Sequence, residues 1–325
     1  MGLGAGPPNK PPGQGNTYSL NVFSCDRLAK RYGRITALRE VTMSVEPGLV
    51  GLLGPNGAGK STLISVLLGQ TPATSGHAAV LNLDVRRQQR AIRRRVGFVP
   101  ENDCLIAGMS GTGYVYYTGR LAGMSHGDAM QRTHEVLDYV DLDEARYRPT
   151  EGYSAGMKQR LKLAQALVHD PDLLFLDEPT NGMDPQGRQT MLSLISDLGN
   201  AGISVLLSSH LLPDVQRVCE RVIIMGGGEV LTSGRISEMN KPHPTLYSVD
   251  FSGDGAELRR GLSERSVSVL EHSDGRLNIQ LPAEGSQSVV LEAARDTGAK
   301  LIGLHPKRSS LEDTFMDAIQ RQRQT

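Results

Sequence analysis

A glycine-rich loop lies between two apolar runs and reads Gly54-Pro55-Asn56-Gly57-Ala58-Gly59-Lys60-Ser61-Thr62. Residues 49–53 before it predict a buried strand, and residues 63–68 after it predict the start of a buried helix. Glycines allow the backbone to curl so that several amide N–H groups point at one anion, and the helix N-terminus adds partial positive charge. The order of strand, loop and helix therefore predicts a phosphate-binding loop at residues 54–62.

Two side chains of this loop and two carboxylates elsewhere suggest a nucleotide and metal site. Lys60 is expected to reach the β- and γ-phosphates of a nucleotide, and the Ser61 hydroxyl to hold Mg²⁺. Four apolar residues at 173–176 precede the adjacent carboxylates Asp177 and Glu178. Because neighbouring strand residues point to opposite faces, we expect Asp177 to orient Mg²⁺ and Glu178 to polarise an attacking water.

Four further residues are candidates for which the local sequence leaves two interpretations open. Tyr32 either stacks on a nucleotide base or packs half-buried, and Glu101, which ends an apolar run, lies near the phosphates or metal or is a loop charge. Ser154 suits the N-cap of a helix, which is either an ordinary capped helix or a second anion site. His210, which ends another apolar run, is either structural or a contact to the γ-phosphate.

The composition limits the class of protein. Lys and Arg total 35, as do Asp and Glu, so the net charge is zero and no nucleic-acid partner is expected. No apolar run approaches the roughly 20 residues that span a bilayer, and no signal peptide is expected. The three cysteines are scattered without a CxxC pair, which favours a reducing compartment and neither metal nor disulfide framework. Six arginines between residues 86 and 95 are expected to lie on a solvated surface.

The 325 residues suffice for more than one domain. Residues 1–17 are rich in Gly and Pro and are expected to form a disordered extension. Residues 18–244 are expected to form an α/β domain with a helical subdomain at about 101–170. Residues 245–325 show the pattern βαββαβ, which predicts a small ferredoxin-like domain with a regulatory or dimer-forming role. Residues 311–319 are expected to form a final amphipathic helix.

Together these motifs resemble the ATP-binding subunit of an ABC transporter over about residues 20–240. Residues 54–62 are similar to the Walker A motif of that family, LLFLDEP at 173–179 to Walker B, and YSAGM at 153–157 to the signature motif. The turn that contains Asp184 resembles the D-loop. The resemblance implies ATP and Mg²⁺ as cofactors, catalytic roles for Lys60, Glu178 and His210, and metal binding by Ser61, Asp177 and Glu101. The nucleotide-binding residues that it implies are Tyr32, Gly54, Pro55, Asn56, Gly57, Ala58, Gly59, Lys60, Ser61, Thr62, Ser154 and Gly156.

The family resemblance also implies a fold and partners. The expected fold is α/β, with a P-loop NTPase (RecA-like) core, an antiparallel β subdomain, an inserted helical subdomain and a small C-terminal α+β domain. The nucleotide is expected between two copies of the chain, or between this chain and a homologous ATPase. A permease on a separate chain would span the membrane, with this subunit peripheral on its cytoplasmic face. Residues 310–315 are similar to the end of ATPases that drive ABC-2-type, drug-resistance-like exporters, which favours export.

This sequence departs from the family pattern at several positions. Ala155 replaces the first glycine of the signature, Met157 replaces its glutamine, and Asn181 stands in the D-loop turn where serine is common. Glu101 stands where the family usually has the glutamine of the Q-loop, and a carboxylate can hold Mg²⁺ but cannot donate a hydrogen bond. These changes keep open a weakly hydrolysing regulatory subunit. A soluble non-transport ABC-type ATPase is a further alternative, which the single P-loop and zero net charge disfavour.

Overall fold

The computed structural model describes residues 21–239, 242–273, 275–282, 286–308, 311–313 and 315–316. The chain divides into two compact units between Ile236 and Ser237. The predicted boundary between residues 244 and 245 falls inside β11 (Pro242–Ser252), the first strand of the second unit. The predicted extension at 1–17 lies outside the described residues, as do residues 314 and 317–319 of the predicted helix at 311–319, whose described residues are helical.

A six-stranded sheet forms the centre of the first unit, and five of its strands run parallel. Every residue of β3, β7 and β8 is buried, as the apolar runs predict for a sheet covered on both faces. Parallel strands end at one edge, so the segments that follow β3, β6, β7 and β8 meet there. In sheet order, the strands are β10 (Glu229–Arg235), β9 (Arg221–Gly226), β3 (Leu49–Leu53), β8 (Ser204–Ser209), β7 (Leu173–Asp177) and β6 (Val96–Val99).

A second, antiparallel sheet packs with helix α1 (Lys60–Leu67) on the same core. Phe23 of this sheet contacts Phe175 of the central sheet, with ring centroids 6.2 Å apart. Gly33 adopts a left-handed φ of 58° in the turn between β1 and β2, which a residue without a Cβ tolerates. In sheet order, the strands are β2 (Ile35–Val45), β1 (Phe23–Tyr32), β4 (Ser75–Val80) and β5 (Leu83–Asp84).

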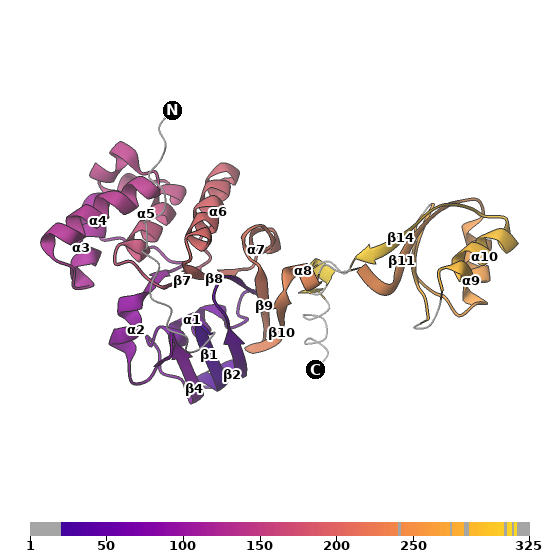
Figure 1. Cartoon of the computed structure of the whole chain (residues 1–325), viewed down its shortest axis with the longest axis horizontal. Helices are drawn as coiled ribbons and strands as arrows, with labels where there is room; N and C mark the ends of the chain where they lie inside the picture. The colour runs from indigo at the N-terminus through magenta and orange to yellow at the C-terminus, as the bar shows by residue number, and fades with distance from the viewer. Residues whose placement is uncertain are drawn as a thin grey trace. The chain divides into compact units, whose positions relative to one another are not determined.

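The helical subdomain lies between β6 and β7 in the sequence, and its three main helices pack together (Figure 1). Each begins at a serine whose hydroxyl accepts a hydrogen bond from a first-turn amide: Ser110, Ser125 and Ser154. The helices are α3 (Gly111–Leu121), α4 (His126–Tyr139) and α5 (Ala155–Leu167), with the 3₁₀ turns η1 (Asp143–Tyr147) and η2 (Thr150–Gly152) before α5. The other helices of the first unit are α2 (Gln89–Arg95), α6 (Pro185–Asn200) and α7 (Leu212–Val218), and α8 (Ile236–Met239) begins at the division between the units.

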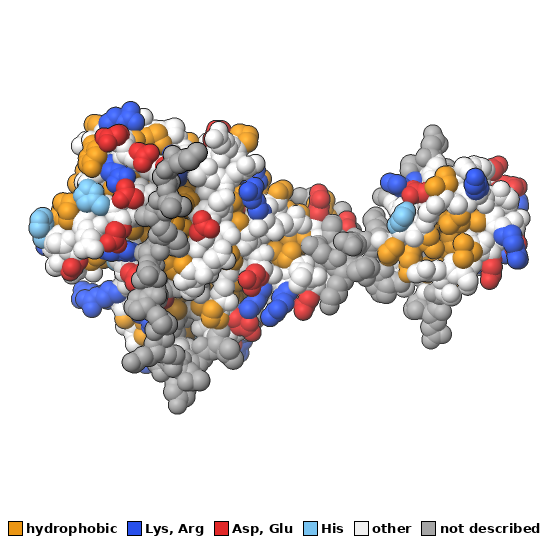
Figure 2. All heavy atoms as spheres, turned by 45° about the horizontal axis from the view of Figure 1, so that its top comes forward, with side chains coloured by type: hydrophobic (Ala, Val, Ile, Leu, Met, Phe, Trp, Pro, Cys, Tyr) orange, Lys and Arg blue, Asp and Glu red, His pale blue; other side chains and the backbone are white. Residues whose placement is uncertain are grey.

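The second unit has the predicted element order βαββαβ. Two helices cover one face of its antiparallel sheet, around a core that includes Val249, Leu258, Leu277 and Val290. Figure 2 shows hydrophobic side chains gathered on the visible face of this unit, with charged side chains around them. The elements that follow β11 are α9 (Gly255–Ser263), β12 (Ser268–Ser273), β13 (Arg276–Gln280), α10 (Ser288–Thr297) and β14 (Lys300–Arg308). Their sheet order, β12-β13-β11-β14, is that of a ferredoxin-like fold.

Candidate functional site

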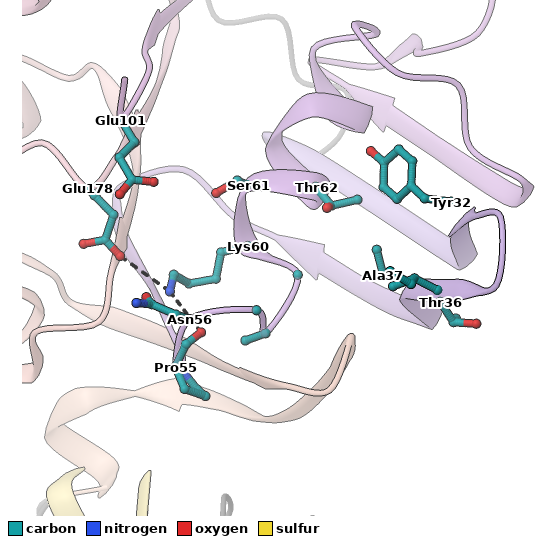
Figure 3. Close-up of a pocket in the computed structure, with 14 residues that line it drawn as sticks. Tyr32, Thr36, Ala37, Pro55, Asn56, Lys60, Ser61, Thr62, Glu101 and Glu178 are labelled. Atoms are coloured by element: carbon teal, nitrogen blue, oxygen red, sulfur yellow. Dashed lines mark hydrogen bonds and ion pairs between the residues drawn. The ribbon is translucent and has the colours of Figure 1, made fainter. Parts of the chain in front are cut away.

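A cavity of about 500 Å³ opens around the glycine-rich loop. Figure 3 shows Tyr32, Thr36 and Ala37 at one side of this loop and Glu101 and Glu178 at the other. The cavity therefore joins the β1–β2 hairpin to the segments that follow β3, β6 and β7. Its lining residues are Tyr32, Ile35, Thr36, Ala37, Pro55, Asn56, Gly57, Ala58, Gly59, Lys60, Ser61, Thr62, Glu101 and Glu178.

The glycines of the loop have conformations and neighbours that exclude a side chain. Gly59 has a φ of 99°, and a Cβ there would lie 2.6 Å from the carbonyl oxygen of Ala37. A Cβ on Gly54 would lie 2.5 Å from the carbonyl oxygen of Met225. Gly59 also caps helix α1 without any side-chain hydrogen bond, so the first-turn amides of the helix have no side-chain acceptor at the cap. This arrangement suits an anion such as a phosphate.

The Lys60 ammonium is buried at the cavity and lies between carbonyl groups and a carboxylate. Its Nζ lies 2.6 Å from the Gly54 carbonyl oxygen, 3.4 Å from that of Pro55 and 3.5 Å from Glu178 Oε1. The side chains of Lys60 and Glu178 are each 6% exposed. The buried positive charge is therefore compensated within the chain, and a nucleotide phosphate would have to compete for it.

Glu178 connects Lys60 to His210, the candidate contact to the γ-phosphate. Its backbone has a left-handed φ of 49°, and its N–H donates to the Ser208 carbonyl at 3.0 Å. Its Oε2 lies 2.8 Å from His210 Nδ1, while Oε1 faces Lys60. His210 is 40% exposed and is not among the residues that line the cavity, so it reaches the site through Glu178.

Asp177 lies at the end of β7, and its side chain points into the protein. It is buried, and its Oδ1 has no hydrogen-bond partner among the described residues. An orphaned carboxylate oxygen is costly unless a cation or water binds it, so the residue fits a metal ligand. Ser61 and Glu101 line the cavity, whereas Asp177 does not. Hydroxyl and carboxylate oxygens are the donors that Mg²⁺ prefers, and joint binding of Mg²⁺ by these three residues stays a prediction.

Glu101 lies on the loop after β6, and its neighbours fix it from two directions. Its Oε1 accepts a hydrogen bond from Asn181 Nδ2 at 3.3 Å. Lys162 of α5 donates to its carbonyl oxygen at 3.1 Å. Burial lowers the pKa of Lys162, while nearby Cys104, Asp103 and Glu101 oppose that shift. Lys162 was not predicted as a site residue, although its position between the buried Leu161 and Leu163 of α5 is a signal that the sequence offers.

The residues of the signature-like motif lie away from this cavity. The Ser154 Oγ accepts a hydrogen bond from the Met157 N–H at 3.2 Å and so caps α5. Neither Ser154 nor Gly156 lines the cavity of the same chain. Their predicted contact to a nucleotide stays a prediction that needs a second copy of the chain.

Tyr32 lies at the end of β1, where its ring borders the cavity and is 47% exposed. Lys30 Nζ lies 4.7 Å from the ring centroid. The exposed ring is available to stack on a planar group. Ile35, Thr36 and Ala37 of the facing strand also line the cavity and were not predicted, because only the hairpin brings them next to Tyr32.

A buried carboxylate behind the site was also missed. Asp214 of α7 accepts hydrogen bonds from Thr180 Oγ1 and from Arg188 Nε, each at 2.6 Å. Thr180 follows Glu178 closely in the chain, and Arg188 lies on α6. The network therefore links the segment after the acidic pair to the helix after His210.

Comparison with known proteins identifies the family. Residues 38–181 match the family model described as ABC transporter. The chain is 31% identical over 307 residues to the linearmycin resistance ATP-binding protein LnrL of Bacillus subtilis, covering 92% of this chain and 99% of that protein. It is 36% identical over 309 residues to the daunorubicin/doxorubicin resistance ATP-binding protein DrrA of Streptomyces peucetius, covering 93% of each. The chain belongs to the ATP-binding proteins of ABC transporters.

This ABC ATPase also has the fold of solved members of the family. The structure of cbiO1 from Clostridium perfringens, part of the ABC transporter complex cbiONQ, has a TM-score of 0.62 and 26% identity. The similarity covers 68% of this chain and 90% of that one. The predicted α/β P-loop fold, the ATPase activity and the resemblance to exporter ATPases are thus confirmed. In the part of the chain that the structure describes, no helix has the length and apolar character needed to cross a membrane.

Proposed function

We propose that this ABC ATPase binds ATP and Mg²⁺ in the cavity around residues 54–62 and powers export through a separate membrane-spanning permease. The observation that carries the proposal is the convergence of Lys60, Glu178 and Glu101 on one cavity from the segments that follow three different strands, β3, β7 and β6. The loop amides and Lys60 bind the phosphates, and Tyr32 stacks on the base.

The contacts of Lys60 and Glu178 define a catalytic exchange. The ammonium leaves Glu178 and the Gly54 carbonyl to bind phosphate oxygens, which frees Glu178 Oε1 to accept a proton from the attacking water. His210 continues to hold Oε2 and so keeps the carboxylate oriented. Ser61, Asp177 and Glu101 hold Mg²⁺, which when bound neutralises charge on the phosphates.

A second copy, or a homologous ATPase, completes the site in this proposal. Ser154 and Gly156 do not line the cavity of their own chain, and they lie at the N-terminus of α5, where they would contribute an anion-binding surface to a partner's nucleotide. Light scattering of Glu178→Gln, with and without ATP and Mg²⁺, tests this arrangement. A monomer that dimerises only with nucleotide supports it, and a constant monomer contradicts it.

A mixing experiment tests whether the site is shared between two chains. Lys60→Ala and Gly156→Asp should each abolish most hydrolysis, because each damages both sites of a homodimer. In a mixed dimer both defects fall in one site and the other site is intact, so mixing the two inactive variants should restore activity. A Cβ at Gly156 meets only the Met183 Cε, at 3.3 Å, and the Ser154 Oγ, at 4.0 Å, so this substitution is compatible with folding. Failure to restore activity would contradict a shared site.

The permease partner and a location on the cytoplasmic face of the membrane are supported by family membership. The names of the relatives refer to resistance to linearmycin and to daunorubicin or doxorubicin, which favours export. Recovery of the chain with membranes, released by carbonate, would support this role, and co-sedimentation with ribosomes would support a non-transport ATPase instead. Equal turnover of the assembled wild-type complex and its Glu178→Gln variant would support a weakly hydrolysing regulatory subunit.

A further inference from the structure

Lys162 of helix α5 is fully buried although its side chain ends in an ammonium group. Its Nζ lies 2.7 Å from the carbonyl oxygen of Pro100, 3.1 Å from that of Glu101 and 3.3 Å from that of Asn102. An ammonium has three N–H donors, and here three consecutive residues of one loop provide the acceptors. A single helical side chain therefore fixes the backbone on both sides of Glu101.

A second lysine of the same helix extends this contact by one residue. Lys158 lies one turn before Lys162, and its Nζ lies 2.9 Å from Asp103 Oδ2. Residues four apart lie on one face of a helix, so both lysines face the loop. We name the two lysines and the segment 100–103 the lysine clamp.

The lysine clamp connects two segments of the chain that both contact a nucleotide in the proposed function. The clamped segment carries Glu101, which borders the cavity, and α5 begins at the Ser154 cap of the signature-like motif. Lys162 holds the Glu101 backbone, whereas the Glu101 side chain accepts an exposed hydrogen bond from Asn181 Nδ2 at 3.3 Å. Helix α5 therefore makes four hydrogen bonds to residues 100–103, through Lys158 and Lys162, whereas Asn181 from the segment after β7 makes one.

We propose that the lysine clamp is a positioning device, which makes Glu101 move with helix α5 and so links its place in the cavity to the signature-like motif. The inference rests on the proposed role of Glu101 at Mg²⁺ or water. Lys162 is a positioning residue, because it acts through the Glu101 backbone and does not line the cavity. When a nucleotide bound to the partner displaces α5, the clamp displaces Glu101 together with the helix.

The reaction rate of the Cys104 thiol, which lies next to the clamp, shows whether the clamp is formed without a measurement of ATP hydrolysis. Cys104 follows the clamped segment directly and is exposed, while Cys25 and Cys219 are buried. Burial raises the pKa of both buried thiols, which slows their reaction with an aromatic disulfide reagent. Lys162→Met should release the loop and accelerate the reaction of Cys104 severalfold, measured as the pH-independent rate of its thiolate, because the substitution also removes a positive charge near this thiol. Global unfolding would instead expose all three thiols.

Arg160 offers a matched control on the same helix. Its guanidinium donates to the carbonyl oxygens of Val140 and Asp141, at 3.1 and 2.6 Å, and not to the clamped segment. Arg160→Met should leave the Cys104 rate at the wild-type value. Equal Cys104 rates in wild type and Lys162→Met would overturn the clamp.

A double-mutant cycle of ATP hydrolysis tests the positioning role. Glu101→Ala and Lys162→Met should each slow hydrolysis, and the double variant should be no slower than the worse single variant, because both act through one group. Multiplied losses in the double variant would overturn the clamp and leave the role of Glu101 intact. Unchanged hydrolysis in Glu101→Ala would instead overturn the role of Glu101 itself, and with it the link to the cavity.

If Lys162→Met fails to fold, the exposed pair provides the same test. Lys158→Asp should accelerate the Cys104 reaction and slow hydrolysis, and addition of Asp103→Lys should restore both, since the reversed charges attract again. The side chains of Lys158 and Asp103 are 29% and 57% exposed, so the exchange leaves the core intact. A reversed pair as defective as Lys158→Asp alone would contradict the proposal.

Discussion

The Lys60 ammonium faces the Glu178 carboxylate across the floor of the cavity, with Nζ 3.5 Å from Oε1 and both side chains 6% exposed. A buried pair of this kind is stabilised only while both charges are present. The structure therefore holds the lysine that we propose to bind phosphate and the proposed general base against each other. Nucleotide binding would separate them, which couples occupation of the site to release of the base.

Lys60→Ala should reduce hydrolysis by about 10²–10³-fold, because it removes a preorganised cation from the developing phosphate charge. It should also weaken nucleotide binding, since Lys60 lines the cavity. Titration with a fluorescent ATP analogue and release of inorganic phosphate measure the two effects. The exposed Lys300 of the second unit provides a control, Lys300→Ala, that should change neither.

His210→Ala should slow hydrolysis by about 10–100-fold and leave the affinity for ATP nearly unchanged. The histidine holds Glu178 Oε2 at 2.8 Å but does not line the cavity, so its loss disorients the base without removing a phosphate ligand. Single-turnover hydrolysis and equilibrium binding separate the two quantities. A variant that loses affinity and keeps its turnover would contradict this role.

Asp214→Asn should destabilise the first unit by about 2–3 kcal/mol, because it leaves the Arg188 guanidinium and the Thr180 hydroxyl without their shared carboxylate. Asp214 is almost completely buried, so water cannot replace the lost charge. Chemical denaturation of the full chain measures the effect. Thr180→Val removes one hydrogen bond of the same network and should cost about 1 kcal/mol. Equal stability of Asp214→Asn and wild type would exclude a structural role for the network.

The stability of the first unit should fall below pH about 6.5 partly because of His169. Burial lowers the pKa of His169 in the folded chain, while its hydrogen bond to the Val96 carbonyl opposes that shift. The unfolded chain therefore binds more protons than the folded chain as the pH falls through the unfolded pKa, and stability decreases. His169→Gln should flatten the dependence of Tm on pH between about 5 and 6.5. Replacement of the exposed His77 by glutamine should leave the wild-type slope, and an unchanged slope in His169→Gln would refute the assignment.

Much of the fold follows from local patterns. The apolar runs before Gly54, Asp177 and His210 predict buried strands, and the structure has β3, β7 and β8 there. Serine before a helical pattern predicts an N-cap, and Ser154 caps α5. The resemblance to ABC ATPases rests on the same motifs, and the comparisons confirm it.

Other features of the site depend on contacts that no local pattern describes. Thr36 and Ala37 border the cavity only because the β1–β2 hairpin folds over the loop. Asp214 is an ordinary helical carboxylate in the sequence, and only packing of α6 against α7 brings Arg188 to it. The sequence left His210 either structural or a contact to the γ-phosphate, and the structure places its Nδ1 2.8 Å from Glu178 Oε2.

The sequence by itself determined which chemical groups are available to the site. Glycine torsions, a lysine at a helix start and carboxylates after a buried strand are local properties of the chain. Only the tertiary structure decided which of these groups touch. Parallel strands from distant parts of the sequence end at one edge of the sheet, which sets Lys60 against Glu178 and Glu178 against His210. The same packing buries Lys162 against the Glu101 loop, since a buried ammonium is tolerated only where acceptors surround it.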